Sequence, residues 1–219
     1  MESNQLQRNN FWNEARRYKF TSSSIYKLLT PSKSKEAKER GDISETARTY
    51  IIEKIAEELD GFIPDFVNDA TAYGTEMETK ARHWYDKLTG NKTIDVGFEK
   101  YNEFYGGSPD SKVVTPDGDN GALEIKCPYN SINHLRHCLI NNVDYFKAKH
   151  NDYYWQCVSH MVTLGVNWCD FVSFDGRINH KIGFFIFRLE RNEEDVKLLL
   201  KAVEKAQIEK QKIKAQLGL

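Results

Sequence analysis

The sequence has few cysteines and no closely spaced pair of them. Four cysteines are too few for a disulfide scaffold in 219 residues, and the lack of any C-x-x-C pair argues against a zinc ribbon. Each cysteine stands among apolar or aromatic neighbours, so we expect all four to be reduced core residues. They are Cys127, Cys138, Cys157 and Cys169.

Long hydrophobic runs are also missing. The longest apolar runs, such as 183–187, fall far short of the roughly 18 residues that a membrane helix needs. The polar first ten residues contain no apolar signal-peptide core. The content of glycine and proline is too low for a fibrous chain, and 40% hydrophobic residues is too high for a disordered one. We therefore expect a cytoplasmic protein without membrane contact, folded as one domain over residues 1–219.

The chain carries no excess of charge of either sign. Its 31 Lys and Arg residues almost balance 32 Asp and Glu residues, so the overall basic character of many nucleic-acid-binding proteins is absent. The distribution is uneven, because residues 1–40 hold nine Lys or Arg against four Glu, and residues 41–110 hold fifteen Asp or Glu against seven Lys or Arg. This pattern fits an anion-binding end beside a carboxylate-rich pocket, but it also fits ordinary solvated helix surfaces.

Hydrophobic periodicity predicts helices first, then a meander of strands, and then further helices and strands. We expect a helix N-cap at Thr21–Ser24 and a helix over Ala70–Leu88 that is capped by Asn68 or Asp69. The fold class is therefore α/β, with a small mixed β-sheet flanked by helices. The other expected helices are Ile43–Leu59 (ending at Gly61), Ser131–Ile140, Asp152–Leu164 and Asn192 to about Lys214, and the expected strands are Ile94–Tyr101, Glu103–Tyr105, Ser111–Thr115, Leu123–Cys127, Trp168–Phe174 and Lys181–Leu189.

The most informative stretch joins a Ser-Pro-Asp turn to a strand of alternating apolar and charged residues. In Leu123–Cys127 the charged residues Glu124 and Lys126 share one strand face, opposite the core-facing apolar residues. The turn-rich segment 115–121 predicts a hairpin, and folding it about Gly118 places Asp110 roughly across from Lys126. Two carboxylates and one ammonium group would then converge on one patch.

Such a patch suits metal-assisted hydrolysis of a phosphodiester. Mg²⁺ prefers oxygen ligands and often uses one or two carboxylates with water. A bound metal lowers the pKa of its water, and a neighbouring lysine can orient that water and offset negative charge. Taken alone, a pair such as Glu124 and Lys126 is usually a surface ion pair. The Ser-Pro-Asp turn, the hairpin and the apolar alternation favour the catalytic interpretation.

Five motifs in order resemble the PD-(D/E)-x-K nuclease superfamily, and within it the lambda-exonuclease/YqaJ-like viral recombinase family. The resemblance spans about residues 12–189 and implies a restriction-endonuclease-like core over 71–190, with a helical and basic part over 1–70 and a final helix over 191–219. The matching residues are Arg16, Thr21 and Ser23; Gly74 and Glu78; Ser108, Pro109 and Asp110; Leu123, Glu124, Lys126, Cys127 and Pro128; and Tyr153 and Gln156.

The resemblance implies a Mg²⁺-dependent 5′→3′ exonuclease that acts on double-stranded DNA ends in phage-type recombination, in a bacterial or phage-infected cell. It implies that Asp110, Glu124 and the Ile125 carbonyl bind the metal, with Glu78 completing or supporting the metal shell, and that Mn²⁺ can substitute. It also implies that Lys126 positions the attacking water. Arg16, Ser23, Ser108 and Gln156 are the implied contacts to DNA and its 5′-phosphate, and Gln156 also belongs to the implied catalytic set.

Relatives of this kind form trimeric rings, so the resemblance implies a homo-oligomer, and it suggests a single-strand annealing protein as a partner. Two departures from the family pattern are Ser111 after the Ser-Pro-Asp turn, and Val158 where relatives often carry a second glutamine. The segment between Lys33 and Asp69 matches poorly, so we assign it no function.

Two other functions remain open from the sequence. An endonuclease of the same fold would carry the same catalytic residues, although an iron–sulfur nuclease is disfavoured because the cysteines are scattered. A catalytically silent DNA-binding or scaffold protein is disfavoured because Glu78, Asp110, Glu124 and Lys126 are all present.

Overall fold

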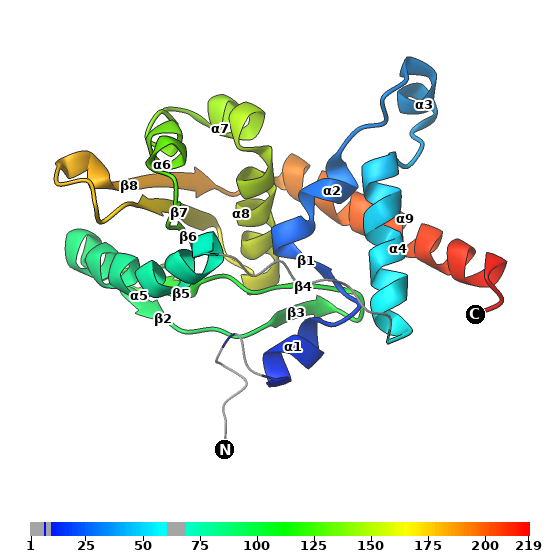
Figure 1. Ribbon diagram of the computed structural model, residues 1–219, viewed down its shortest axis with the longest axis horizontal. Coiled ribbons are helices and arrows are strands. Elements are labelled where there is room, and N and C mark those ends of the chain that lie inside the picture. The colour runs from blue at the N-terminus through cyan, green and yellow to red at the C-terminus, as the bar shows by residue number, and fades with distance from the viewer. Residues whose placement is uncertain (1–6, 8–9, 61–68) are drawn as a thin grey trace.

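The computed structural model describes residue 7 and residues 10–60 and 69–219 (Figure 1). Gly61 and Asn68, two expected helix caps, lie outside the described residues. In chain order the elements are α1 (Asn10–Arg16), β1 (Phe20–Thr21), η1 (Ser22–Ser24), α2 (Tyr26–Leu29), α3 (Lys35–Arg40), α4 (Glu45–Glu58), α5 (Asp69–Thr89), β2 (Lys92–Ile94), β3 (Glu99–Asn102), β4 (Tyr105–Gly107), β5 (Ser111–Val114), β6 (Asn120–Lys126), α6 (Ser131–His137), α7 (Val143–Lys149), α8 (Asn151–Leu164), β7 (Trp168–Phe174), η2 (Lys181–Gly183), β8 (Phe184–Glu190) and α9 (Glu193–Gln216).

A five-stranded mixed sheet forms the centre of the fold. Its strand order is β2-β5-β6-β7-β8, in which β6 and β7 are parallel and the other neighbours are antiparallel. The parallel step requires a crossover, and the chain makes it through α6, α7 and α8. The predicted α/β class with a small mixed sheet flanked by helices is therefore confirmed.

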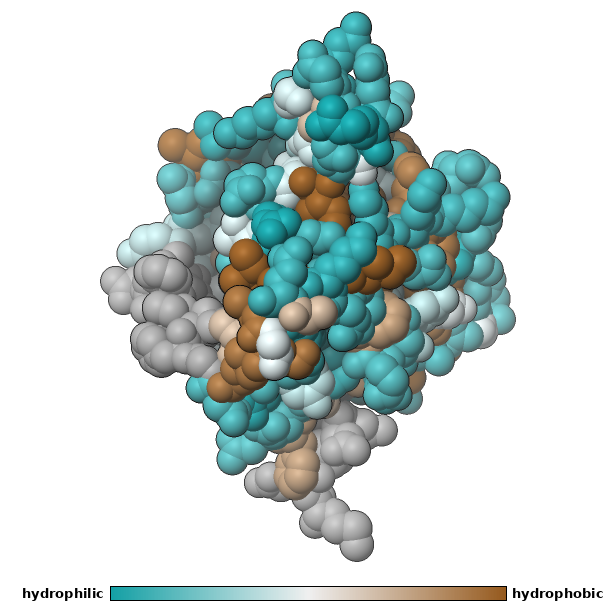
Figure 2. All heavy atoms as spheres, turned by 90° about the vertical axis from the view of Figure 1, so that its right-hand side faces the viewer, coloured by the Kyte–Doolittle hydropathy of each residue, from teal (hydrophilic) through white to brown (hydrophobic). Residues whose placement is uncertain are grey.

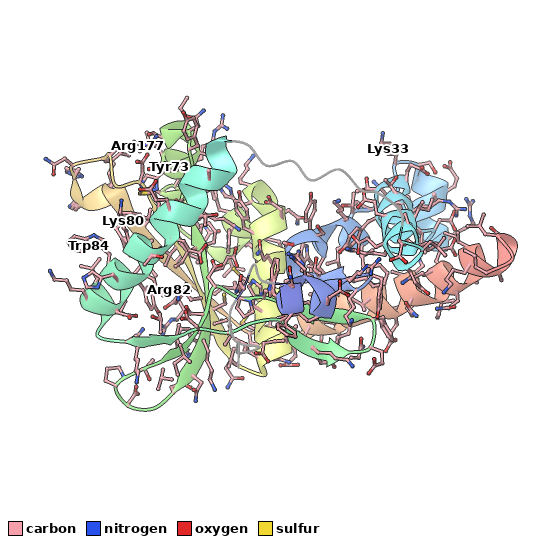
Figure 3. The ribbon with its side chains drawn as sticks, turned by 60° about the horizontal axis from the view of Figure 1, so that its bottom comes forward. Lys33, Tyr73, Lys80, Arg82, Trp84 and Arg177 are labelled. Carbon is pink, nitrogen blue, oxygen red and sulfur yellow. The ribbon has the colours of Figure 1, made fainter. Side chains whose placement is uncertain are left out.

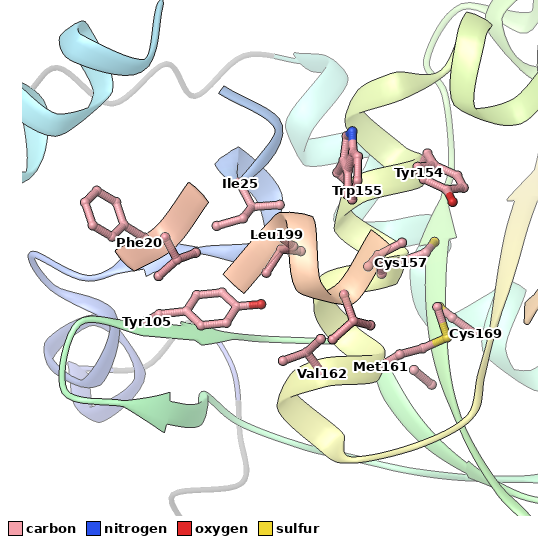
Figure 4. Packing of buried hydrophobic residues seen from close by; sticks show 14 of the residues in the cluster. Phe20, Ile25, Tyr105, Tyr154, Trp155, Cys157, Met161, Val162, Cys169 and Leu199 are labelled. Atoms are coloured by element: carbon pink, nitrogen blue, oxygen red, sulfur yellow. The ribbon is translucent and has the colours of Figure 1, made fainter. Parts of the chain in front are cut away.

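Helices cover both faces of this sheet. Ala81 and Tyr85 of α5 pack on one face, against a cluster that includes Leu123 and Ile125 of β6. Helix α8 covers the other face, and its buried side chains form a larger core with α9 and the N-terminal segment (Figure 4). Strand β6 therefore lies between two helices, and its charged residues point toward α8 while its large apolar ones point toward α5.

A second, three-stranded sheet connects the N-terminal segment to this core. Strand β1 pairs in parallel with β4, so that Phe20 and Thr21 lie beside Tyr105 and Gly106. Glycine at position 107 leaves room for the Ser22 hydroxyl, which a Cβ atom there would force to move. Residues about 85 positions apart are thus held in contact next to the Ser-Pro-Asp turn.

Helices α2, α4 and α9 form the opposite end of the molecule from the five-stranded sheet (Figure 1). Hydrophobic side chains are visible among the hydrophilic ones on this end (Figure 2). Exposed apolar residues of α4 and α9 include Ile52 and Ile208. Over the described ranges, none of the helices has the length and apolar character needed to cross a bilayer.

Several predicted boundaries are wrong in informative ways. The expected strand Ile94–Tyr101 is two strands, β2 and β3, which belong to different sheets. The expected side-chain cap at Thr21–Ser24 is absent, because residues 22–24 form a 3₁₀ turn and Ile25 is the N-cap of α2. Helix α7 was not predicted, and the N-terminal part of the expected strand Lys181–Leu189 is the 3₁₀ turn η2.

The four cysteines were expected to be core residues. Only Cys157 and Cys169 are fully buried, whereas Cys127 and Cys138 are half-buried.

Candidate active site

The β5–β6 hairpin brings the two predicted carboxylates together. The amide of Asp110 donates to the Leu123 carbonyl at 3.1 Å, and the amide of Ile125 donates to Oδ2 of Asp110 at 2.6 Å. Ser111 pairs with Leu123, so Asp110 lies across from Glu124 rather than Lys126. The expected register was wrong by two residues, because the turn is centred on Asp117 and not on Gly118.

Glu124 is held from two sides. Oε1 pairs with the ammonium of Lys126, and Oε2 accepts from Nε2 of His160 at 2.8 Å. Glu124 is 1% exposed and His160 0%, so this charged face of β6 is itself covered by α8. The expectation that Glu124 lies outside the core was therefore wrong. A buried carboxylate is stable only when such partners satisfy its charge and lone pairs.

The electrostatics of this cluster shift the pKa values of the two carboxylates in opposite directions. Burial, followed by the negative charges of Glu124 and Glu78, raises the pKa of Asp110 well above its usual range. Burial would also raise the pKa of Glu124, but Lys126 and His160 outweigh it and lower that pKa. Burial alone would lower the pKa of Lys126, yet Glu124 and Asp110 raise it, so this lysine stays charged. The cluster therefore has a fixed anion, a fixed cation and one crowded carboxylate.

A small cavity joins this cluster to the predicted phosphate-binding residues. Its volume is about 170 Å³. It is lined by Gln7, Trp12, Arg16, Thr21, Ser22, Ser23, Ser108, Asp110, Glu124, Lys126 and Gln156. All four implied DNA contacts therefore face the same space as both central carboxylates and the lysine.

Trp12 connects the two sides of this cavity. Its indole Nε1 donates to the Ser108 hydroxyl at 2.8 Å, and the guanidinium of Arg16 lies 4.1 Å from the centre of its ring. Because the Ser108 oxygen accepts from the indole, its own proton can be donated to a ligand in the cavity. The exposed Ser23 and the buried Gln156 complete the polar lining.

A buried hydroxyl cluster fixes the N-terminal segment against α8. The Ser159 hydroxyl lies 2.7 Å from that of Ser22 and 2.5 Å from that of Tyr105. All three side chains are at most 1% exposed. Hydrogen bonds of this kind, together with β1–β4 pairing, hold Ser23 beside Gln156 on the neighbouring helix surface.

A larger cleft, of about 580 Å³, opens on the other side of Asp110 and Lys126. Glu78 reaches it from α5 and forms an ion pair with Arg82 at 3.4 Å. Gly74 lies one turn earlier, and a Cβ atom there would contact the Cys127 carbonyl oxygen at an ordinary 3.8 Å. The helix therefore does not need glycine at position 74 in order to approach the sheet.

Two buried histidines of α6 share one serine at the wall of this cleft. His134 Nδ1 and His137 Nδ1 each lie 2.8 Å from the Ser173 hydroxyl oxygen, and His134 Nε2 lies 2.7 Å from the Ile182 carbonyl. A carbonyl only accepts, so His134 carries its proton on Nε2 and accepts from Ser173. Ser173 then accepts from Nδ1 of His137, which leaves the Nε2 lone pair of His137 as an acceptor at the cleft.

The sequence model of the YqaJ-like viral recombinase domain matches residues 11–167, which include every motif in the two cavities. The chain belongs to this family. No curated protein matches it.

Three solved structures resemble this YqaJ-like chain over most of its length. LHK-Exo in complex with dAMP is 27% identical, with a TM-score of 0.74, and the match covers 96% of this chain and 98% of that one. The alkaline exonuclease LHK-Exo from Laribacter hongkongensis is likewise 27% identical over the same shares of the two chains, with a TM-score of 0.70. A phage-related exonuclease from Haemophilus somnus 129PT, at 20% identity and a TM-score of 0.73, covers 94% of this chain and 99% of that one and shares the fold.

The YqaJ-like chain offers a donor set that fits a hard divalent cation. In the part of the chain that the structure describes, no three His, Cys, Asp or Glu side chains group closely enough to bind a metal alone. Mg²⁺ does not need such a group, because it usually keeps several waters and takes one or two carboxylates. Asp110, Glu124 and the Ile125 carbonyl could supply these oxygens, and a cation would offset the burial and the carboxylate repulsion that raise the pKa of Asp110.

Sequence reasoning missed three residues of this site: Trp12, His137 and His160. His160 follows Gln156 by four residues on a helix, so both lie on one helix face, and that spacing was a usable signal. His137 had no comparable signal, because its position depends on Ser173 in a strand 36 residues later.

Proposed function

We propose that the chain is a Mg²⁺-dependent 5′→3′ exonuclease that degrades one strand of double-stranded DNA from a 5′-phosphorylated end. Phage-type recombination, in the cytoplasm of a bacterium or a phage-infected cell, is the proposed setting. One observation carries the proposal: Arg16, Ser23 and Ser108 line the same small cavity as Asp110, Glu124 and Lys126. A site that holds a terminal phosphate beside the hydrolytic residues selects DNA ends.

The terminal phosphate would bind to the polar side of the cavity. Arg16 supplies a planar donor that suits a phosphate, and Ser108 supplies a hydroxyl proton because Trp12 already donates to its oxygen. Ser23 adds a second hydroxyl. Binding of the end there would place the first phosphodiester next to Asp110 and Lys126, which border both cavities.

Asp110, Glu124 and the Ile125 carbonyl would hold Mg²⁺, with Glu78 supporting them, and Mn²⁺ could replace it. The bound ion would supply a water of lowered pKa and stabilise charge on the phosphate. Lys126 would orient the attacking water, and Gln156 would hold a water or a phosphate oxygen. In-line attack breaks the bond to the 3′-oxygen, so each product carries a 5′-phosphate.

Linear and closed circular DNA test this function. The parent protein should digest a linearised, 5′-phosphorylated plasmid with Mg²⁺ or Mn²⁺, and should leave it intact with EDTA. A covalently closed circle of the same sequence should survive, because it has no end. Digestion of the circle would instead indicate an endonuclease of the same fold.

Asp110→Asn provides the matched inactive control. The Asn oxygen can still accept from the Ile125 amide, so the hairpin should stay intact while the metal-binding charge is lost. This variant should not digest linear DNA at any Mg²⁺ concentration. A parent protein that binds ends without digesting them would support a catalytically silent DNA-binding protein.

Oligomeric state and partner are part of the proposal. We propose a trimeric ring that encircles duplex DNA and acts with a single-strand annealing protein. The near-neutral net charge is compatible with a ring, because only the channel must be basic to follow phosphates. Sedimentation equilibrium should give about three times the 25.5 kDa chain mass.

A further inference from the structure

A second groove runs along α5, outside the catalytic cluster. Its volume is about 710 Å³, and it lies between α5 and the segment that follows β7. Its walls include the aromatic side chains of Tyr73, Trp84 and Phe174, and the basic side chains of Lys80, His83 and Arg177. Figure 3 shows Tyr73, Lys80 and Trp84 along one side of α5, with Arg177 close to Tyr73 and Arg82 on the other side. We call this the α5 groove.

The groove combines the exposed ring of Trp84 with basic side chains. Trp84 is 43% exposed, and the ammonium of Lys87 lies 5.0 Å from its ring centre. Lys80 is paired with Glu76 at 3.3 Å, but both side chains remain well exposed. Beyond Trp84 and Phe174 the groove continues into an adjacent hollow that is lined by His180 and Lys181.

Two packed tyrosine rings and Arg177 form a ridge between the groove and the catalytic cleft. The rings of Tyr73 and Tyr129 meet edge to face at 5.7 Å, and Tyr129 lines the cleft while Tyr73 lines the groove. The guanidinium carbon of Arg177 lies 4.7 Å from the ring centre of Tyr73 and 6.0 Å from that of Tyr129. The guanidinium also donates to the Pro128 carbonyl at 3.1 Å. A chain that leaves the cleft across this ridge therefore enters the groove directly.

Arg177 is fixed in place by the buried Asp175. Two of its nitrogens donate to the two carboxylate oxygens at 2.8 and 2.9 Å. This pairing offsets part of its charge, but it holds the guanidinium plane against the tyrosine rings. Such a plane is itself a stacking surface for a nucleobase.

We propose that the α5 groove binds single-stranded DNA, namely the strand that hydrolysis leaves unpaired. This inference rests on the proposed exonuclease function, which generates a 3′ single strand next to the cleft. Bases inside a duplex are already stacked on one another and cannot use the exposed ring of Trp84 or the guanidinium plane of Arg177. Unpaired bases can stack there while their phosphates meet Lys80 and Lys181, which is how sequence-independent single-strand sites work.

Binding of end-labelled duplexes in EDTA tests the groove without any digestion. We expect the parent protein to bind a duplex with a 3′ oligo-dT extension more tightly than the blunt duplex. Trp84→Ala should remove most of this difference, with about 5- to 100-fold weaker binding of the extended duplex. Lys80→Ala should lower the slope of log K against log salt concentration by about 0.7, the value for one lost phosphate contact on a single strand.

Matched controls lie elsewhere on the surface. Tyr101→Ala removes an exposed aromatic ring of similar exposure from β3, and Lys197→Ala removes a helix lysine that is paired, like Lys80, with a glutamate of its own helix. Both should bind like the parent protein. Equal losses in Trp84→Ala and Tyr101→Ala, or no advantage of the 3′ extension in the parent, would overturn the proposal.

The two proposals can fail separately. If the parent digests linear duplex but a 5′ extension, rather than a 3′ extension, gives the tighter binding, the groove assignment is wrong and the exonuclease function stands. If the parent does not digest DNA but Trp84→Ala selectively loses single-strand binding, the groove is a single-strand site and the exonuclease function is wrong. In both cases the binding of DNA by Tyr101→Ala is the reference against which the loss in Trp84→Ala is measured.

Discussion

His160 Nε2 donates a 2.8 Å hydrogen bond to Oε2 of Glu124, and neither residue is more than 1% exposed. A carboxylate can only accept, so His160 carries a proton on Nε2. Its Nδ1 is buried without a hydrogen-bond partner among the described residues. His160 therefore orients the central carboxylate through its Nε2–H group.

Two replacements of His160 distinguish its role in orienting Glu124 from a role in packing the core alone. His160→Leu should reduce duplex digestion about 10- to 100-fold and raise the Mg²⁺ concentration needed for half-maximal rate, because partners of metal-binding residues typically have effects of that size. His160→Gln places an amide nitrogen near the position of Nε2 and should restore much of the rate. Initial digestion rates over a Mg²⁺ series measure both effects. If Leu and Gln behave alike, the hydrogen bond has no role in orienting Glu124.

Lys126 should act on the chemical step rather than on DNA binding. Its ammonium pairs with Glu124 and lies 4.9 Å from the Tyr153 ring centre, beside the proposed water-binding position. Lys126→Ala should lower the single-turnover rate about 100- to 1,000-fold while the affinity for duplex ends stays close to that of the parent. Rapid-quench kinetics and equilibrium binding measure the two quantities. A variant whose only defect is weaker binding would refute this role.

Arg16 should provide the preference for 5′-phosphorylated ends. A terminal phosphate carries more charge than an internal phosphodiester, so a guanidinium in the small cavity distinguishes the two. Arg16→Ala should remove most of the preference, at a cost of about 1.5–3 kcal/mol for a lost hydrogen bond to a charged group. The measurement is the initial digestion rate on 5′-phosphate and 5′-hydroxyl duplexes.

Arg17→Ala is the matched control for that experiment. Arg17 follows directly in the sequence but pairs with Asp60 and Glu14, away from the cavity. This variant should keep the phosphate preference. A preference that survives in Arg16→Ala and disappears in Arg17→Ala would move the phosphate site to the neighbouring residue.

His137 should make stability depend on pH. Burial, and then His150, His134 and Lys126, lower its pKa from 6.5 to about 3. The unfolded chain therefore binds this proton more readily than the folded protein. The free energy of unfolding should fall as pH drops from about 6.5 toward 3, by at most about 1.4 kcal/mol per pH unit from this group. His137→Asn, which keeps a donor near Ser173, should show a shallower pH dependence in urea unfolding between pH 7 and 4.

The strands that carry the proposed catalytic residues were largely predictable from the sequence, because each has a strong local pattern. Strand β7 occupies Trp168–Phe174 as predicted, and the hairpin that joins Asp110 to Glu124 was expected from its turn residues. The register was wrong by two residues. Both Gly118 and Asp117 suit a tight turn, and only the hydrogen bonds of Thr115 with Gly118 and Asp119 show where its centre lies.

The remaining errors concern features that tertiary contacts decide. The segment Ile94–Tyr101 has one continuous β pattern, yet its two ends pair with different strands, Ser111–Val114 and Tyr105–Gly107. Glu124 was expected outside the core, because a charged residue on an alternating strand usually faces solvent. Its burial is stabilised by Lys126 and His160, and the second of these is 36 residues away in the sequence.

The parallel pairing of β1 with β4 has a consequence for the order in which the protein becomes active. Arg16 and Ser23 leave the ribosome early, but the cavity they line also needs Ser108 and Gln156. The Ser22 hydroxyl can form its hydrogen bond only after Ser159 has been synthesised. Contacts between such distant segments form late, because the loops between them must close first. A nascent chain would therefore acquire the proposed end recognition and cleavage together, only after most of its length has been synthesised.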